Sequence, residues 1–139
     1  MKWDDYFKTL LALVIWREAR GEGQDGMRAV AHVIRNRVVA THLPDRWEDV
    51  ILGKNQFTSM TYAGDSQLVA WPKEPDEKFE FAMRTAQRVY DGEDEDNTGG
   101  ALFYANLKSA TSGWFFTEIV GKPLDHPRTV TIGRHTFFK

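Results

Sequence analysis

Glu18 is the residue of this 139-residue chain whose position best suits acid–base chemistry. It continues a line of apolar residues, Phe7, Leu11 and Val14, at the spacing of one face of a helix. A carboxyl group on a buried face is desolvated, and the helix C-terminus adds the negative end of a dipole. Both effects favour the protonated form, which can protonate a glycosidic oxygen. The alternative is a solvated glutamate paired with a neighbouring arginine.

Two further segments carry side chains suited to sugars. In segment 56–71, aromatic rings can stack on sugar rings while amides and hydroxyls bind sugar hydroxyls; the candidates are Gln56, Phe57, Thr58, Tyr62 and Trp71. In an expected strand over 101–106, Tyr104 and Asn106 point to the same face. Trp16 is a candidate apolar wall beside Glu18. The alternatives are an ordinary surface loop and a core tyrosine hydrogen bond.

Several classes of site are excluded by composition. The chain has no cysteine, so it has no disulfide, thiolate zinc site or cysteine nucleophile. Four histidines, His32, His42, His126 and His135, lack zinc-type spacing, and we expect neither a metal nor a cofactor. A net charge of −2 provides no basic excess for nucleic acid. The acidic run 93–96 is interpreted as a solvated loop.

The elements that must position these residues follow from periodicity. Helices are expected over 3–20, 26–41 and 76–90, and a short turn or helix over 44–52, with Gly21 stopping the first helix and Asp25 capping the second. The match to G-x-G-x-x-G at 21–26 follows a helix and is acidic, which favours a helix–helix turn over a nucleotide site. The segment 129–138 is typical of a strand or a bent strand pair.

These elements predict a mainly helical (α+β) single domain, residues 1–139, with a small antiparallel sheet from the C-terminal third. No segment approaches the roughly 20 apolar residues of a membrane span. The first residues lack the features of a signal peptide. We therefore expect a protein made in the cytoplasm without a signal peptide and without membrane insertion.

The chain resembles the SleB-like cell wall hydrolases, the family of spore-cortex-lytic catalytic domains. The resemblance starts in residues 11–38, where E-A-R-G-E is followed by A-V-A-x-V-I-x-N-R. It continues in Q-F-T at 56–58, G-G-A-L-F-Y-A-N at 99–106 and I-G-x-H-x-F-F at 132–138. Gly23 stands where the family often has proline, Met27 replaces a common glutamine, and 65–75 match no family segment.

This resemblance implies a lysozyme-like, lytic-transglycosylase-related fold that acts on peptidoglycan glycan strands, with Glu18 as the catalytic glutamate. It also implies action on the bacterial cell wall. Because the family's usual leader and wall-binding module are not seen, a phage-type lysis enzyme released by a partner, or a stand-alone domain, is expected. We expect a monomer whose partner is the glycan strand.

The expected reaction breaks the bond between N-acetylmuramic acid and N-acetylglucosamine. A lytic transglycosylase needs only Glu18, as acid and then base. A hydrolase needs a second carboxylate, a nucleophile at about 5–5.5 Å or a base at about 6.5–9.5 Å. The candidates are Glu22, Asp25, Asp65 and Glu118, and none stands out, which favours the transglycosylase.

In this scheme Gln56, Tyr104 and Asn106 orient the N-acetyl group or stabilise the developing charge, and Thr58, Tyr62 and Trp71 line the groove. Three alternatives stay open. The first is a lysozyme-type muramidase, the second a non-catalytic glycan-binding module, and the third a metal-dependent amidase that cuts the peptide stem.

Overall fold

The computed structural model describes residues 2–41, 46–54 and 56–139. Its helices are α1 (Trp3–Ala19), η1 (Arg20–Glu22), α2 (Gly23–Ala40), α3 (Trp47–Leu52), α4 (Thr58–Thr61), η2 (Ser66–Val69), α5 (Glu77–Tyr90), α6 (Gly113–Phe115) and η3 (Phe116–Val120). Its strands are β1 (Phe103–Ala105), β2 (Arg128–Ile132) and β3 (His135–Phe138). The fold is mainly helical with a small antiparallel sheet from the C-terminal third, which confirms the predicted class.

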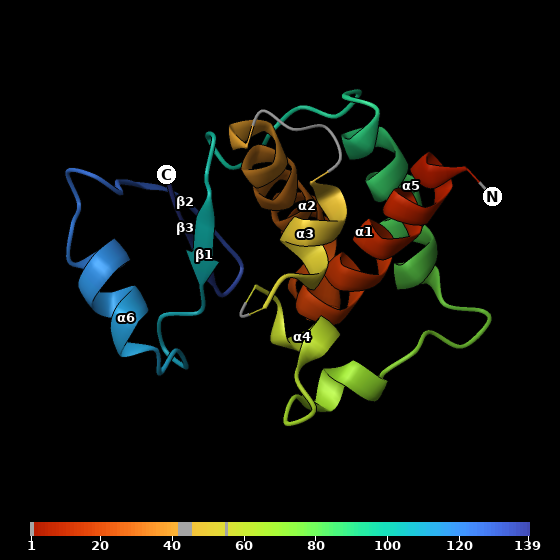
Figure 1. Ribbon diagram of the computed structural model, residues 1–139, viewed down its shortest axis with the longest axis horizontal. Coiled ribbons are helices and arrows are strands. Elements are labelled where there is room, and N and C mark those ends of the chain that lie inside the picture. The colour runs from red at the N-terminus through yellow and green to blue at the C-terminus, as the bar shows by residue number, and fades with distance from the viewer. Residues whose placement is uncertain (1, 42–45, 55) are drawn as a thin grey trace.

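The largest apolar core lies where α1 packs against α2, α3 and α5 (Figure 1). The line of apolar residues predicted on the first helix is buried there, with Leu11 and Val14 fully inaccessible to solvent. Asp76 caps α5, because its Oδ1 accepts a hydrogen bond from the Phe79 amide at 2.8 Å. The helices expected from periodicity are therefore present; the start of the one expected over 44–52 lies outside the described residues.

The connection between α1 and α2 differs in detail from the prediction. Gly21 lies inside the 3₁₀ turn η1, and the left-handed residue is Gly23, with φ of 78°. Helix α2 begins at Gly23, so Asp25 lies in its first turn and is not its cap. Helix α1 ends at Ala19, close to the predicted stop at Gly21, whereas the predicted cap was wrong because α2 begins at Gly23. The predicted helix–helix turn at 21–26 is confirmed.

Helix α2 is the organiser of the fold because it presents three faces. The first, which includes Val30, Ile34 and Val38, packs into the large core. The second, which begins with Ala29 and Val33, contacts the sheet. The third is polar and faces the segment after α5; its members are Asp25, Arg28, His32 and Asn36, at helical spacing.

The sheet has the order β1–β3–β2, with all neighbours antiparallel. All four residues of β3 are buried, because α2 covers one face of the sheet and α6 lies against the other (Figure 1). Gly133 turns the chain from β2 to β3 with φ of 59°. The predicted bent pair over 129–138 is this hairpin. Helix α6 and its continuation η3 were not predicted.

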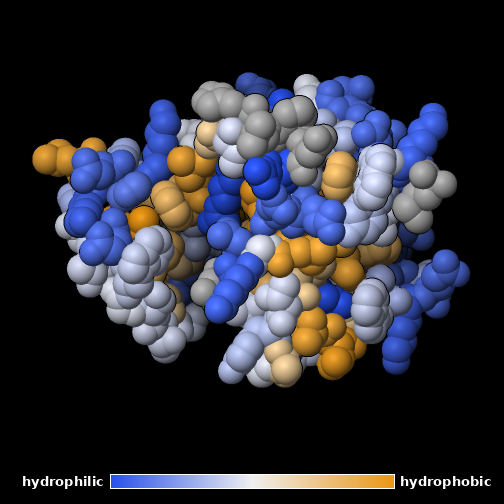
Figure 2. Space-filling view, in the orientation of Figure 1, coloured by the Kyte–Doolittle hydropathy of each residue, from blue (hydrophilic) through white to orange (hydrophobic). Residues whose placement is uncertain are grey.

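The surface of this fold is mixed. In the orientation of Figure 2, apolar side chains reach solvent at the lower edge of the helical body, around η2, where Val69 is 77% exposed. Within the described part of the chain, the helices are too short or too polar to span a bilayer.

Candidate active site

Glu18 lies in the last turn of α1 and is half-buried. Its Oε1 accepts a hydrogen bond of 2.6 Å from the hydroxyl of Tyr104 on β1. The two residues are 86 positions apart in the sequence and are brought together because the sheet packs on α2. Among the described residues, no hydrogen-bond donor engages the other carboxylate oxygen.

Tyr104 is held by aromatic neighbours on β3. Its ring stacks on Phe137 at 5.6 Å and lies 4.9 Å from the ring of His135. Burial, together with the nearby Glu18, raises the pKa of Tyr104 well above its ordinary value of 10.0. The phenol therefore stays protonated, and remains a donor to Glu18, across the whole neutral and mildly alkaline range.

His135 completes this group and was not expected to have a role near Glu18. Its side chain is buried, and Nδ1 has no hydrogen-bond partner among the described residues. Burial lowers the pKa of His135, although the charges of Glu22 and Glu18 act in the opposite direction. The imidazole is therefore neutral at pH 7.

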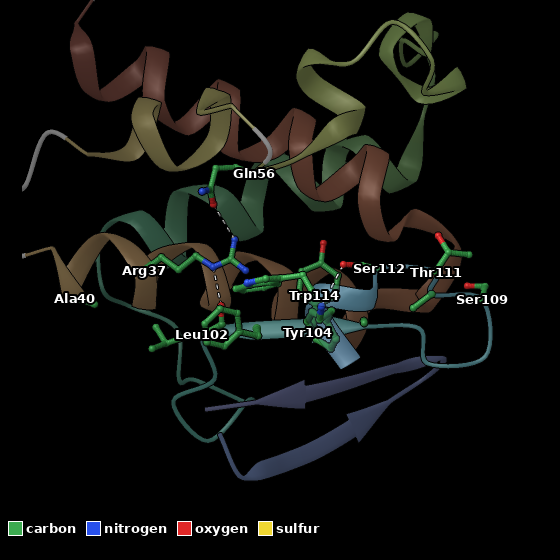
Figure 3. A pocket seen from close by; sticks show the side chains of 13 residues that line it. Arg37, Ala40, Gln56, Leu102, Tyr104, Ser109, Thr111, Ser112 and Trp114 are labelled. Atoms are coloured by element: carbon green, nitrogen blue, oxygen red, sulfur yellow. Dashed lines mark hydrogen bonds between the residues drawn. The ribbon is translucent and has the colours of Figure 1, made fainter. Parts of the chain in front are cut away.

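A groove of about 700 Å³ opens next to Tyr104, which forms part of its wall, whereas Glu18 and His135 lie behind Tyr104 and do not line it (Figure 3). Arg37 of α2 reaches into it between Gln56 and Leu102 (Figure 3). Its Nε donates to the Leu102 carbonyl at 2.7 Å, and its Nη1 donates to Gln56 Oε1 at 3.5 Å. Burial lowers the pKa of Arg37, while Tyr104 and Glu18 act to raise it. Arg37 thus links the groove electrostatically to Glu18.

Sequence reasoning missed Arg37, but a signal for it existed. Arg37 continues the line of Ala29 and Val33 at intervals of four residues, so it extends an apolar face in the way that Glu18 does on α1. The opposite wall was also missed, because α6 was not predicted. It contributes Trp114, 61% exposed, and a preceding run of hydroxyls, Ser109, Thr111 and Ser112.

The structure places the predicted residues of segment 56–71 in different surroundings. Gln56 lines the groove with Arg37. Phe57 does not suit its predicted role: it is 3% exposed and belongs to the large core, so neither ring face is free for a sugar. Trp16 is likewise 5% exposed, packed edge-on against Phe79 at 6.2 Å, and is core instead of a groove wall.

Thr58, Tyr62 and Trp71 lie outside the groove wall. Thr58 and Tyr62 line a separate hollow of about 620 Å³, and the Thr58 hydroxyl donates to Asp65 at 2.7 Å. Trp71 is 63% exposed, with the guanidinium of Arg17 4.6 Å from its ring centre. Any contact of these three residues with a glycan needs a strand that extends beyond the groove.

Asn106 follows β1 and does not continue it. Its Oδ1 accepts a hydrogen bond from the Lys108 amide at 3.2 Å, so the side chain stabilises the turn toward the hydroxyl run. The expected alignment of Asn106 with Tyr104 on one strand face is therefore not found, because the strand ends at Ala105.

Each candidate second carboxylate already has a partner. Glu22 accepts two hydrogen bonds from Arg134, at 2.7 and 3.2 Å, which outweigh burial and lower its pKa. Asp25 pairs with Arg28, and Glu118 pairs with Lys122. Asp65 caps η2 and binds Thr58. Of the four, Glu22 is the one that acts on His135 as Glu18 does, since the charges of both residues raise the pKa of His135.

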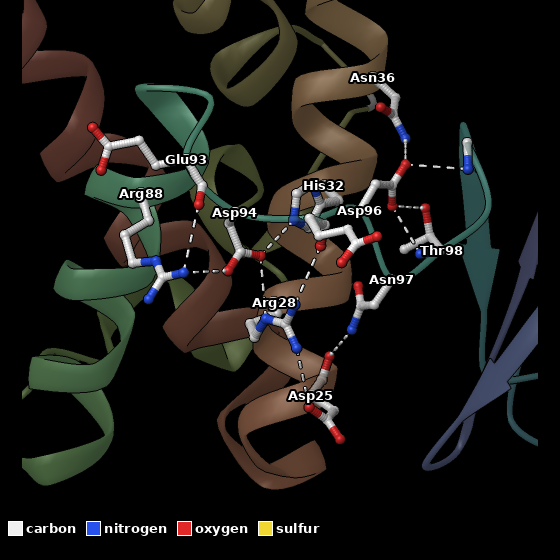
Figure 4. Close-up of polar contacts among 12 residues, drawn as sticks. Asp25, Arg28, His32, Asn36, Arg88, Glu93, Asp94, Asp96, Asn97 and Thr98 are labelled. Atoms are coloured by element: carbon white, nitrogen blue, oxygen red, sulfur yellow. Dashed lines mark hydrogen bonds and ion pairs between the residues drawn. The ribbon is translucent and has the colours of Figure 1, made fainter.

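The acidic segment after α5 is only in part the solvated loop that was expected, because two of its carboxylates belong to a partnered cluster (Figure 4). The Asp94 side chain is 9% exposed and binds His32 at 2.7 Å and Arg28 at 3.2 Å. Asp96 accepts hydrogen bonds from Asn36, Thr98 and the Gly100 amide. These bonds fasten the segment to the polar face of α2 through Asp94 and Asp96, while Glu93 and Glu95 stay exposed to solvent.

Metal-binding residues do not gather at the site. In the described part of the chain, no group of three or more histidine, aspartate or glutamate side chains is arranged to hold a metal ion. His42 lies outside the described residues.

Comparison with known proteins identifies the family. A family model described as Cell Wall Hydrolase matches residues 21–138. The chain belongs to this cell wall hydrolase family. Glu18 lies just before the matched range, whereas Arg37, Tyr104 and His135 lie within it. The resemblance stated from the sequence motifs is thereby confirmed.

Curated relatives in the same family are longer proteins. The spore cortex-lytic enzyme of Oceanobacillus iheyensis is 36% identical over 130 residues, which are 94% of this chain and 40% of that protein. The spore cortex-lytic enzyme of Bacillus subtilis is 32% identical over 128 residues, which are 92% of this chain and 36% of that protein. The chain therefore spans about two fifths of the length of these relatives.

Solved structures of the family share the fold. The catalytic domain of the germination-specific lytic transglycosylase SleB from Bacillus anthracis superposes with a TM-score of 0.71 and 32% identity, covering 100% of this chain and 97% of that one. The catalytic domain of the Bacillus cereus SleB protein gives a TM-score of 0.70 and 32% identity, covering 97% of this chain and 91% of that one. The structural similarity thus extends over the whole fold.

Proposed function

We propose that this domain cleaves the bond between N-acetylmuramic acid and N-acetylglucosamine in peptidoglycan, as a lytic transglycosylase that acts on the bacterial cell wall. The observation that carries the proposal is the hydrogen bond from Tyr104 to Glu18 beside a groove of about 700 Å³. The similarity to a catalytic domain named as a lytic transglycosylase supports it.

The proposed reaction uses Glu18 twice. The protonated carboxyl donates its proton to the glycosidic oxygen, and the bond from that oxygen to the muramyl C1 breaks. The resulting carboxylate then accepts the proton of the muramyl C6 hydroxyl as O6 bonds to C1. A 1,6-anhydro ring forms, Glu18 is protonated again, and no water is consumed.

The neighbours of Glu18 suit this cycle. Tyr104 donates to Oε1 in both protonation states, since its raised pKa keeps the phenol neutral. It thus fixes the carboxyl group in place and leaves one oxygen for the proton transfers. Gln56 lines the groove with its amide group and is suited to bind an N-acetyl group or a sugar hydroxyl.

The pairing of all four candidate second carboxylates favours the transglycosylase over a muramidase. Among these candidates, Glu22 and Glu18 both act electrostatically on His135. The two hydrogen bonds from Arg134, however, hold Glu22 in place and lower its pKa. A general base must be free to take a proton from water, and a nucleophile must be free to reach C1. Neither role suits a carboxylate that is engaged by a guanidinium.

Glu18→Gln tests the proposal, since it keeps the side-chain shape and removes the acid. We expect the rate of glycan cleavage to fall by about 10³-fold or more, with little change in melting temperature. Glu77→Gln, at an exposed glutamate at the start of α5, is the matched control. Equal clearing of peptidoglycan suspensions by the parent and Glu18→Gln would show that the role of Glu18 is wrong and leave a binding module.

Mass spectrometry of the released fragments decides among the enzyme classes. Anhydromuramyl ends are expected. Reducing muramyl ends would identify a muramidase, and freed stem peptides together with loss of activity on chelation would identify a metal-dependent amidase.

A further inference from the structure

Arg37 is a half-buried cation with no acidic partner among the described residues. Its guanidinium lies 5.5 Å from the ring centre of Phe57 and 5.7 Å from that of Phe103. Its acceptors, the Leu102 carbonyl and the Gln56 amide, are both neutral. Within residues 2–41, 46–54 and 56–139, it forms no ion pair. A charge removed from water is costly unless an opposite charge compensates it.

Other arginines show how this chain normally satisfies that requirement. Arg28 binds Asp94, and Arg134 binds Glu22. Arg17, which is 6% exposed, uses its guanidinium to hold the carbonyls of Ser59 and Ala70, so its role is to fasten segment 59–70 to α1. Arg37 differs because it lines an open groove, and no described residue accepts a hydrogen bond from its Nη2.

The negative charge that acts on Arg37 from within the protein is that of Glu18, and it is absent when Glu18 is protonated for the proposed reaction. Tyr104 and Glu18 are the groups that act on it electrostatically, and Tyr104 is neutral. Glu18 gives its hydrogen bond to Tyr104 and not to Arg37. In the proposed reaction Glu18 must be protonated when the strand binds, so at that moment Arg37 faces the groove as an uncompensated cation.

We propose that Arg37 binds a carboxylate of the glycan strand in the groove and makes the site selective for negatively charged strands. The planar guanidinium matches a carboxylate with two parallel hydrogen bonds. The carboxylate has two possible sources, which are the lactyl group of muramic acid residues without a stem peptide and the stem peptides themselves. This inference rests on the proposed function, because it assumes that the strand lies in the groove beside Glu18.

The experiment compares charged strands with the same strands after neutralisation. One pair consists of strands stripped of stem peptides, before and after carbodiimide-coupled amidation with ammonia. A second pair consists of strands with intact stems, treated in the same way. For the parent protein we expect kcat/KM to fall about tenfold on amidation of the pair that carries the recognised carboxylate, mostly through KM.

Arg37→Met is expected to lose this discrimination, so that its charged and amidated strands are cleaved with equal kcat/KM. Arg37→Lys, which keeps the charge, is expected to recover part of it. Arg84→Gln, at an exposed arginine of α5, removes the same charge elsewhere and is expected to discriminate like the parent. Because Arg37 also binds Leu102, its variants are compared by the ratio between substrates, which loss of stability does not alter.

The outcomes separate this inference from the proposed function. If kcat/KM falls on amidation only for strands stripped of stem peptides, Arg37 recognises the lactyl carboxylate. If it falls only for strands with intact stems, Arg37 recognises a stem carboxylate. Equal cleavage of charged and amidated strands by the parent, or discrimination that persists in Arg37→Met, overturns the inference. In that case anhydromuramyl products from the parent would still support the proposed function, whereas failure of that function would remove those products from every substrate.

Discussion

Two polar clusters lie on neighbouring faces of α2 and use their charges in opposite ways. In the acidic cluster, Asp94 is surrounded by donors from α2 and α5, and Asp96 by donors from α2 and its own segment (Figure 4). At the groove, Arg37 has neutral acceptors (Figure 3), and next to Tyr104 the Nδ1 atom of His135 has no acceptor or donor among the described residues.

The difference in pairing suits two different roles, one structural and one in binding a ligand. Complete pairing is what a structural cluster requires, since an unpaired buried polar group costs about 1–3 kcal/mol. Incomplete pairing leaves groups that a ligand can satisfy. The acidic cluster fastens the chain after α5 to α2, and through Gly100 it sets the start of the segment that carries Tyr104. One cluster thus supports the position of the other.

The sharpest test of this contrast is Tyr104→Phe. It removes the donor to Glu18 while keeping the ring that packs on His135 and Phe137. We expect kcat for glycan cleavage to fall on the order of 100-fold, with a small change in thermal stability. Tyr62→Phe, at an exposed tyrosine outside the groove, is the control. Full activity of Tyr104→Phe would show that the hydrogen bond has no part in the reaction.

Asp94→Asn should show the opposite pattern. It removes the charge that binds His32 and Arg28, and we expect a loss of about 2 kcal/mol in unfolding free energy with normal kcat in the folded protein. Hydrogen bonds from His32 and Arg28 outweigh burial and lower the pKa of Asp94 below 3.8. The advantage of the parent is therefore present above pH 3.8 and lost as the pH falls through the lowered pKa. Denaturant unfolding of the parent and of Asp94→Asn at several pH values measures this difference in unfolding free energy.

The smallest effect is expected at His135, where burial lowers the pKa from 6.5. The folded protein then holds this imidazole neutral while the unfolded chain protonates it, so the parent loses stability as the pH falls below 6.5. His135→Phe should remove this part of the pH dependence. Glu22, Glu18 and Arg134 also act on His135. Parallel stability curves for the parent and His135→Phe between pH 5 and 8 would contradict the expectation.

The sequence predicted those features that depend on local periodicity. Apolar spacing located α1, α2 and α5, and the same spacing drew attention to Glu18. It could not identify Phe57 or Trp16 as core, because an aromatic residue in a loop or at a helix end looks the same whether it covers a groove or fills an interior. The burial of Asp94 was equally hidden, since its donors lie more than 60 residues away on α2.

Long-range pairing explains the remaining differences. The hydrogen bond between Glu18 and Tyr104 joins residues 86 positions apart, and no local pattern encodes it. The family motifs narrowed the choice because they mark both residues. Arg37 stands in those motifs and continues the apolar line of Ala29 and Val33 on α2. The same reasoning that singled out Glu18 on α1 therefore applies to Arg37, although only Glu18 was predicted from it.

The strand order has a consequence for how this protein becomes active during synthesis. Strand β3 lies between β1 and β2, yet it is the last of the three to leave the ribosome. Until it emerges, β1 and β2 have no partner in the sheet, and Tyr104 lacks the His135 and Phe137 rings that hold it toward Glu18. A nascent chain can form its helices early because their contacts are local, but the site must wait for β3. Translation itself therefore delays the assembly of the candidate site.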